Sequence, residues 1–220
     1  MTGFLALPLL FGACVPAASP APALPPLTGC SPYDKSIQQN GTRTGAPTLE
    51  EVQANLAGNG TNINLPPRSV AAIAAMERTK GCAKYNDGSP RLGPKQFDCS
   101  GLVIWSYAKA LGKLDPDGSA SLAAKAVLPN DSAGMWTAAQ NRTNRLSPVQ
   151  PGNELPGDLV FYDTDRDGSV NHVAIVAQKG WIVHAEGTPY GLTIKSTTTS
   201  TSGYFISTSN PKFRGIARYT

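Results

Sequence analysis

The sequence is poor in the side chains that carry acid–base and thiol chemistry. Its 220 residues include two histidines and four cysteines, so few residues can serve as a base or as a sulfur nucleophile. Charged residues make up only 15% of the chain, and the formal net charge is +4. No run of lysine and arginine alternates with aromatic residues, so we expect no binding to nucleic acid. The hydrophobic fraction of 40% is sufficient for one packed domain with an additional segment.

The first residues have the composition of an export signal. Residues 1–13 are apolar and carry no charged side chain, and the stretch is too short to span a bilayer as a helix. It leads into Cys14, as in a bacterial lipoprotein signal, although no Lys or Arg precedes it. We therefore predict a signal over residues 1–14, followed either by lipidation of Cys14 or by simple cleavage. Residues 15–30 are rich in Pro and Ala, which predicts an extended tether. The protein is then expected either at the cell envelope, anchored by a lipid, or outside the cell.

The four cysteines divide according to their expected roles. If Cys14 carries a lipid and Cys99 is a free nucleophile, Cys30 and Cys82 remain as a disulfide pair. Their closed loop of about 52 residues would stabilise the fold by about 4 kcal/mol in the chain-entropy treatment. Two unpaired thiols are one alternative. A bridge between Cys82 and Cys99 is the other, and it would block the nucleophile.

The pattern of apolar residues predicts helices first and strands afterwards. Thr48 and Glu51 have the spacing of a capping box, and helices are expected over 48–56, 67–80, 98–111, 119–128 and 131–142. Short β-like runs follow at 158–163, 171–178, 181–186, 192–197 and 213–219. This order predicts an α+β fold in which N-terminal helices pack on a mostly antiparallel sheet. We assign 31–67 to an N-terminal extension and 68–220 to the main domain.

Cys99 is expected in the first turn of a helix whose N-cap is Asp98. The free amides and the dipole at this end of a helix favour an anion, which predicts a lowered thiol pKa. A cysteine by itself is more often a small buried apolar residue than a nucleophile. The thiol gains significance only if a base lies beside it.

The two histidines flank an expected β-hairpin. A three-residue loop over 178–180 would pair Ala177 with Trp181 and place His172 and His184 on one face of the sheet, close enough for contact. His172 can then act as the base for the thiol while His184 orients it. A two-residue loop would place the two imidazoles on opposite faces.

Four short blocks occur in order within residues 68–190. They are Phe97-Asp98-Cys99-Ser100-Gly101-Leu102-Val103, Pro156-Gly157-Asp158-Leu159-Val160-Phe161, Asn171-His172-Val173-Ala174-Ile175-Val176 and Val183-His184-Ala185. Together they resemble the NlpC family of bacterial cell-wall cysteine peptidases. The resemblance implies a papain-like fold and hydrolysis of peptidoglycan stem peptides, usually at the γ-D-glutamyl–diamino acid bond.

The resemblance also implies roles for individual residues. It implies three catalytic residues: Cys99 as nucleophile, His172 as base and His184 as the orienting third member. Asp98 and Ser100 flank the nucleophile where the family often contacts the free amine of the peptide. The family carries an upstream tyrosine that helps the oxyanion site. Tyr85 is the candidate, in a segment that is one residue longer than the family's and lacks the neighbouring aromatic residue.

Two groups of residues have the composition of a metal site, and each has a simpler interpretation. The segment 163–168 begins like an EF-hand loop, but its twelfth position is Ala174 rather than Glu. We interpret it as an acidic hairpin turn, with weak calcium binding as the alternative. A zinc site built from Cys99 and the histidines is the alternative to a triad. We expect no metal or other cofactor.

The predicted function is that of an exported, monomeric peptidoglycan endopeptidase with a Cys-His-His mechanism. One alternative keeps the same triad in a papain-like amidase or acyltransferase that acts on another wall or acyl substrate. The other is a catalytically inactive wall-binding lipoprotein. In each case the expected partner is the cell wall, with membrane attachment through Cys14 if that residue is lipidated.

Overall fold

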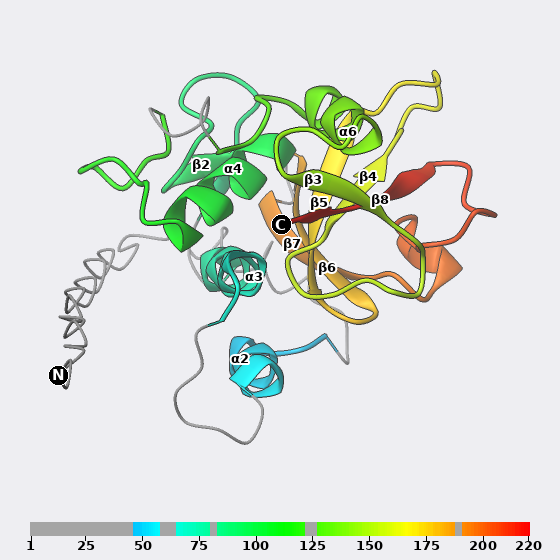
Figure 1. The fold of residues 1–220 in the computed structure, drawn as a ribbon, viewed down its shortest axis with the longest axis horizontal. Helices are drawn as coiled ribbons and strands as arrows, with labels where there is room; N and C mark the ends of the chain where they lie inside the picture. The colour runs from blue at the N-terminus through cyan, green and yellow to red at the C-terminus, as the bar shows by residue number, and fades with distance from the viewer. Residues whose placement is uncertain (1–45, 58–64, 80–82, 122–126, 188–190) are drawn as a thin grey trace, which may run out of the picture.

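Helices precede the strands of the main sheet in the computed structural model, which describes residues 46–57, 65–79, 83–121, 127–187 and 191–220 (Figure 1). Within these residues the helices are α2 (Leu49–Ala57), α3 (Pro67–Thr79), α4 (Cys99–Ala110) and α6 (Ser132–Gln140). The strands of the main sheet are β3 (Leu146–Val149), β4 (Leu159–Tyr162), β5 (His172–Gln178), β6 (Trp181–Gly187), β7 (Gly191–Ser196) and β8 (Phe213–Tyr219). Their order is β3-β8-β4-β5-β6-β7, and every neighbouring pair is antiparallel. The predicted α+β class is confirmed.

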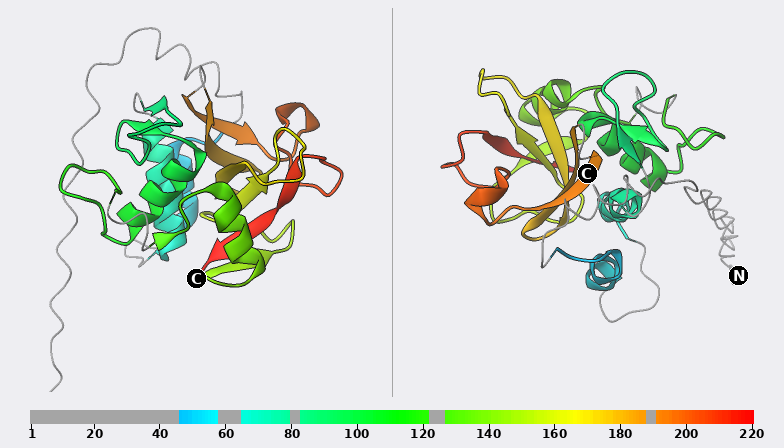
Figure 2. Two further views of the ribbon diagram at one scale, coloured as in Figure 1. Left: turned by 90° about the horizontal axis from the view of Figure 1, so that it is seen from above. Right: turned by 180° about the vertical axis from the view of Figure 1, so that it is seen from behind.

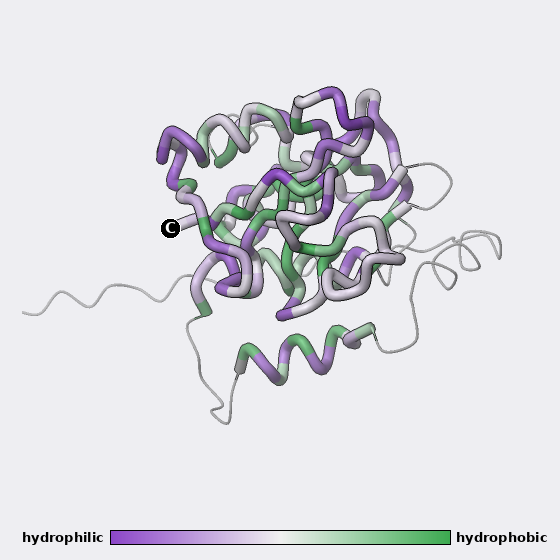
Figure 3. Tube along the Cα trace, turned by 90° about the vertical axis from the view of Figure 1, so that its right-hand side faces the viewer, coloured by the Kyte–Doolittle hydropathy of each residue, from purple (hydrophilic) through white to green (hydrophobic). Residues whose placement is uncertain are grey.

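Helix α2 begins with the predicted capping box. The Thr48 amide donates to Glu51 Oε2 at 2.7 Å, and the Glu51 amide donates to Thr48 Oγ1 at 3.1 Å. These bonds satisfy amides that a helix start leaves without intrahelical partners. Val52 is fully buried in the core, and the tube in Figure 3 shows α2 lying alongside the rest of the domain. The described part of the extension is therefore packed on the main domain.

Helix α4 is the centre of the helical layer. Its residues from Ser100 to Ala108 are all buried, as expected of a helix that is covered on every side. It packs against α3 and against β5, and the two views in Figure 2 show the helices α3 and α4 beside the sheet. The Tyr107 hydroxyl donates to the Gly157 carbonyl oxygen at 2.7 Å. This bond ties the C-terminal half of the helix to the turn before β4.

A second, two-stranded sheet lies directly before α4. Strands β1 (Lys84–Tyr85) and β2 (Gln96–Phe97) pair in parallel, with Tyr85 opposite Phe97. Phe97 is fully buried, and its ring meets that of Trp105 in α4 edge to face at 5.5 Å. This packing fixes the direction in which the chain enters α4.

Strand β3 was not predicted. It contains Pro148, which has no amide proton and is therefore disfavoured inside a sheet. The strand lies at the edge of the sheet and pairs only with β8, so one side of its backbone needs no partner. The prediction missed this strand because the pattern by itself does not distinguish an edge strand that contains a proline from a loop.

Several predicted segments lie partly or wholly outside the described residues. The predicted signal and the tether lie outside them, as do Cys14, Cys30 and Cys82 and half of the helix expected over 119–128. Among the helices that the structure describes, none has the length and apolar character needed to cross a membrane.

The two faces of the main sheet belong to different clusters of buried side chains. Val173, Ile175 and Val183 face α3 and α4 as part of the large core. Ala174, Val176 and Ile182 face the other way and form a smaller cluster, which Tyr204 partly covers. Because side chains alternate along a strand, even-numbered residues of β5 and β6 share this second face.

We predict that Gly157→Ala destabilises the fold far more than Gly152→Ala. Both glycines have a positive φ, 91° and 93°, which costs an alanine about 1 kcal/mol. A Cβ at Gly157 would also lie 2.0 Å from the Arg68 carbonyl oxygen, whereas one at Gly152 would meet nothing within 4 Å. We therefore expect a loss of about 3 kcal/mol for Gly157→Ala and about 1 kcal/mol for Gly152→Ala in denaturant unfolding. Equal losses would contradict the close contact.

Candidate active site

Cys99 is the first residue of α4, as predicted. Asp98 is the N-cap, and its side chain accepts a hydrogen bond from the Gly101 amide. A Cβ at Gly101 would lie 2.0 Å from the Arg91 carbonyl oxygen, so the loop before β2 packs directly on this first turn. The Cys99 thiol is free in the structure, and Cys82, its alternative partner, lies outside the described residues.

The β5–β6 hairpin brings the two histidines together. His172 Nε2 and His184 Nδ1 are 2.7 Å apart and share a hydrogen bond. The predicted loop is wrong in detail: Gln178 pairs with Trp181, which leaves a two-residue loop. The register then shifts between Val176 and Gln178, so Val176 pairs with Ile182. This bulge supplies the extra residue that the prediction had placed in the loop, and both imidazoles face the same way.

The thiol lies where β5 begins. Cys99 Sγ is 3.9 Å from the Asn171 carbonyl oxygen, the acceptor of its hydrogen bond. The backbone amide of Val173 also interacts with the sulfur. Both chain neighbours of His172 therefore contact Cys99. The start of α4 and the start of β5, which carries His172, therefore meet at this point.

Burial favours the neutral forms of all three groups. It raises the pKa of Cys99 to about 11, and the nearby Asp98 carboxylate adds to the effect. Burial, with a smaller contribution from Lys212, lowers the pKa of His172 to about 4. Burial, with the charges of His172 and Lys195, also places the pKa of His184 well below its usual value. The predicted lowering of the thiol pKa is therefore wrong, because desolvation outweighs the amides at the helix start.

Two tyrosines lie within electrostatic reach of the thiol. Burial raises the pKa of Tyr85, and the charges of Cys99, Asp87 and Asp98 raise it further. Tyr85 is thus near the candidate site, as the sequence suggested. Tyr204 was missed: its pKa is also raised by burial and by nearby acidic groups that include Cys99. It lies between β7 and β8, in a segment without a periodic pattern.

A model of the NlpC/P60 family matches residues 84–208, more than half of the chain. The chain belongs to the NlpC/P60 family. The match spans the segment from β1 to the loop before β8 and so includes Cys99 and both histidines. It begins after α3, so α2 and α3 lie outside the matched region.

Three curated relatives show how this family member compares with others. A gamma-DL-glutamyl hydrolase of Bacillus subtilis is 26% identical over 154 residues, which cover 70% of this chain and 29% of the relative. A probable endopeptidase of Corynebacterium glutamicum, Cgl2188, is 28% identical over 191 residues, covering 79% and 78%. The murein DD-endopeptidase MepH of Escherichia coli is 25% identical over 127 residues, covering 58% and 39%. The chain thus spans less than a third of the Bacillus protein.

In this NlpC/P60 chain, Asp98 and Ser100 already have protein partners. One guanidinium nitrogen of Arg91 donates to both carboxylate oxygens of Asp98 and to Ser100 Oγ, each at 2.9 Å. The other donates to the carbonyl oxygen and to Oδ1 of Asn130, at 2.7 and 2.8 Å. Arg91, which the sequence did not single out, therefore neutralises the carboxylate charge beside Cys99.

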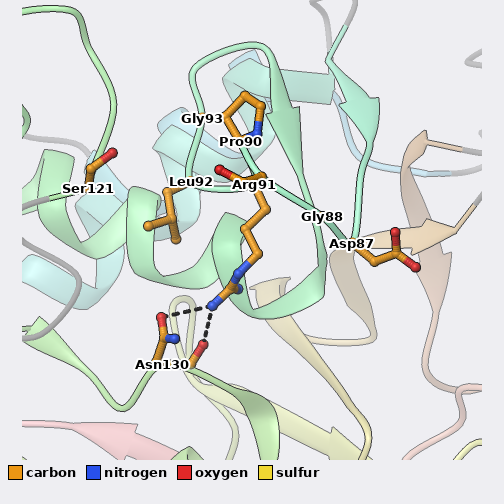
Figure 4. Close-up of a pocket in the computed structure, with 9 residues that line it drawn as sticks. Asp87, Gly88, Pro90, Arg91, Leu92, Gly93, Ser121 and Asn130 are labelled. Carbon is orange, nitrogen blue, oxygen red and sulfur yellow. Dashed lines mark hydrogen bonds between the residues drawn. The ribbon is translucent and has the colours of Figure 1, made fainter.

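A cavity of about 300 Å³ adjoins this network. Figure 4 shows the Arg91 side chain reaching from its loop to Asn130 across one side of the cavity. The lining residues are Asp87, Gly88, Ser89, Pro90, Arg91, Leu92, Gly93, Ser121 and Asn130. The lining therefore consists mostly of the loop between β1 and β2, which also packs on the first turn of α4.

The acidic segment connects β4 and β5 as a hairpin turn, as interpreted from the sequence. The Asp163 carboxylate is fully buried and accepts hydrogen bonds from the amides of Arg166 and Gly168, at 2.6 and 2.9 Å. It also forms an ion pair with Arg214. Carboxylate oxygens of Asp163, Asp165 and Asp167 lie within 4.8 Å of one another. The hydrogen bonds from these backbone amides explain why Asp163 is buried: its carboxylate holds the turn together.

We predict that the protein loses stability as the pH falls from 6.5 towards 4. In this window an unfolded histidine binds a proton, whereas buried His172 stays neutral until about pH 4. The depressed pKa therefore stabilises the fold fully above 6.5, and about 3 kcal/mol from His172 is lost on acidification.

The measurement is denaturant unfolding at several pH values between 4.5 and 7 for the wild type and for a His172→Gln, His184→Gln double variant. The variant retains all carboxylates, so the difference in slope isolates the imidazoles. Identical slopes would show that the histidines are not buried in their neutral form.

The contribution of the Arg91–Asp98 ion pair to stability can be separated from that of helix capping by Asp98. Asp131 caps α6 in the same way, since its side chain accepts from the Gly134 amide at 2.7 Å. We expect Asp131→Ala to lower the free energy of unfolding by about 1 kcal/mol. Asp98→Ala should cost about 3 kcal/mol, because it also leaves the Arg91 guanidinium without its carboxylate. Equal losses in thermal or denaturant unfolding would mean that the ion pair contributes nothing.

Proposed function

We propose that this chain is a cysteine peptidase that hydrolyses peptidoglycan stem peptides. The observation that carries the proposal is the 2.7 Å hydrogen bond between His172 Nε2 and His184 Nδ1, beside a free thiol at the start of α4. Membership of the NlpC/P60 family supports it. Relatives named endopeptidases or a hydrolase, one of them a murein endopeptidase, support a wall substrate.

The hydrogen bond limits which nitrogen can serve as the base. Since Nε2 of His172 is engaged by His184, Nδ1 is the nitrogen left to accept the thiol proton. We assign Cys99 as nucleophile, His172 as base and His184 as the residue that orients it. Backbone amides at the start of α4, with the Tyr85 hydroxyl, are assigned to the oxyanion.

The reaction then starts from neutral groups. The thiol leaves the Asn171 carbonyl and gives its proton to His172 Nδ1 as the sulfur attacks the scissile carbonyl carbon. Collapse of the tetrahedral intermediate breaks the C–N bond, and the imidazolium returns the proton to the leaving amine. A water then gives a proton to the same nitrogen and attacks the thioester, which releases the acid and restores the thiol.

A second part of the proposal concerns which bond of the stem peptide is cleaved. Of the relatives' names, one specifies a γ-DL-glutamyl bond and another a DD bond, so they do not agree on a single linkage. We propose the γ-D-glutamyl–diamino acid bond, on the residue blocks shared with the family. We further propose that the protein is exported and acts on the wall as a monomer, either lipid-anchored through Cys14 or free.

The test is digestion of purified muropeptides by the full chain, with fragments identified by mass. We expect release of L-Ala-D-Glu fragments by the wild type and none by Cys99→Ala. We expect His184→Ala to lower kcat/KM by about 10²-fold or more, because the base loses its orientation.

The outcomes separate the linkages and the alternatives. Conversion of cross-linked dimers into monomers instead would replace the γ-D-glutamyl bond by a DD bond and keep the mechanism. A folded wild type with a free Cys99 thiol that releases nothing from any muropeptide would overturn the peptidase proposal. Amidase or acyl-transfer chemistry, or a binding role, would then be tested with other wall substrates.

A further inference from the structure

One ring nitrogen of the histidine pair has no partner. His184 is fully buried, and its Nδ1 bonds to His172. Its Nε2 lacks any hydrogen-bond partner among the residues that the structure describes. A buried polar nitrogen without a partner is costly whether or not it carries a proton, so its surroundings decide between the two tautomers of the pair.

Only one of these tautomers can act as a base. In the first arrangement His172 donates from Nε2, its Nδ1 keeps a lone pair, and His184 carries its proton on Nε2. In the second, His184 donates from Nδ1, and the proton of His172 then sits on Nδ1, where it blocks transfer from the thiol. Each arrangement gives both histidines the same kind of tautomer, Nε2–H in the first and Nδ1–H in the second.

The ring of Tyr204 lies against this pair. Its centroid is 4.5 Å from that of His184, with the planes at 67°, and 5.6 Å from that of His172. The Tyr162 hydroxyl donates to the Tyr204 carbonyl oxygen at 2.6 Å, and the two tyrosine rings meet edge to face at 5.2 Å. Tyr204 is therefore anchored through its backbone as well as through its ring.

We propose that the Tyr204 ring is the partner of the His184 Nε2–H group and that Tyr204 thereby holds the pair in the Nε2–H tautomer. The face of an aromatic ring is negative, so it accepts an N–H group and repels a nitrogen lone pair. A ring 4.5 Å away at a steep angle is in the range for such a contact. Tyr204 is a positioning residue for the base, and its role in turnover rests on the proposed function.

The charged groups near the pair do not provide a hydrogen bond in its place. Lys195, on β7, acts on His184 through its charge and is paired with Glu186 at 3.0 Å. Lys212, in the segment before β8, acts on His172 in the same way. Neither ammonium group favours a proton on the imidazoles, so neither accounts for an Nε2–H group on His184.

Histidine NMR tests the proposal directly, because the full chain contains only two histidines and therefore four ring nitrogens. In protein labelled with ¹⁵N-histidine, we expect Nε2 of both residues to carry the proton and both Nδ1 atoms to be bare. We also expect the His184 Nε2–H proton to be shifted upfield by the ring current of Tyr204. Protons on both Nδ1 atoms, or an unshifted Nε2–H signal, would overturn the proposal without any variant.

Two variants separate the ring from the hydroxyl. Tyr204→Phe keeps the aromatic face, so the tautomers and the upfield shift should remain. Tyr204→Leu removes it, so the shift should disappear, and we expect the Nδ1–H tautomer to become detectable. We also expect kcat/KM on muropeptides to fall about tenfold in Tyr204→Leu and to be largely restored in Tyr204→Phe.

Unchanged tautomers in a folded Tyr204→Leu protein would show that the ring only fills space. If Tyr204→Leu does not fold, the comparison of wild type with Tyr204→Phe decides, since loss of the upfield shift in Tyr204→Phe would assign the role to the hydroxyl and overturn the proposal. The tautomer spectra need no substrate. A failure of the muropeptide assay therefore leaves this test intact, and a wrong tautomer leaves the assay intact.

Discussion

The register of one hairpin links the parts of the candidate site. The two imidazoles meet because the register of β5 against β6 shifts by one residue at Ala177. Without this shift, His184 would project towards α3 and α4 while His172 stayed on the other face. The same contact engages Nε2 of His172 and leaves Nδ1 as the other ring nitrogen, which is the base in the proposed mechanism. Strand register, hydrogen-bond direction and the choice of base nitrogen are therefore one constraint rather than three.

Burial then sets the electrostatic character of the site. Both imidazoles are buried and Cys99 is half-buried, and desolvation favours a neutral thiol beside neutral imidazoles. His184 brings no negative charge, unlike a carboxylate in the same position, so it cannot stabilise an imidazolium by charge attraction. In the proposed mechanism its contribution is orientation through the hydrogen bond to His172. Arg91 acts against this tendency at the thiol, because it offsets the charge of the Asp98 carboxylate, which raises the pKa of Cys99.

Local features were predictable from the sequence because their causes are local. The capping box at Thr48 and the N-cap at Asp98 depend on residues three positions apart, and both have the expected bonds. Alternating apolar residues marked five of the six strands of the main sheet. Strand β3 was missed because Pro148 is tolerated only at an edge, and which strand lies at the edge is a property of the assembled sheet.

The contacts of Arg91 and Tyr204 had no such local signal. Arg91 reaches Asn130, 39 residues later in the chain, and Tyr204 packs on histidines from two different strands. The thiol pKa was predicted in the wrong direction for a related reason. The helix start is visible in the sequence, but the desolvation that outweighs it depends on what packs over the sulfur.

The sequence by itself determined the helix that begins at Cys99, the hairpin that carries both histidines, and the family to which these blocks belong. Each follows from spacing along the chain, where the physics of capping and strand alternation operates over a few residues. The tertiary structure alone decided that a bulge rather than a longer loop aligns the imidazoles. It also decided that Arg91 pairs with Asp98 and that the Tyr204 ring packs on His184. These depend on packing between distant segments, whose free energy no short stretch of sequence contains.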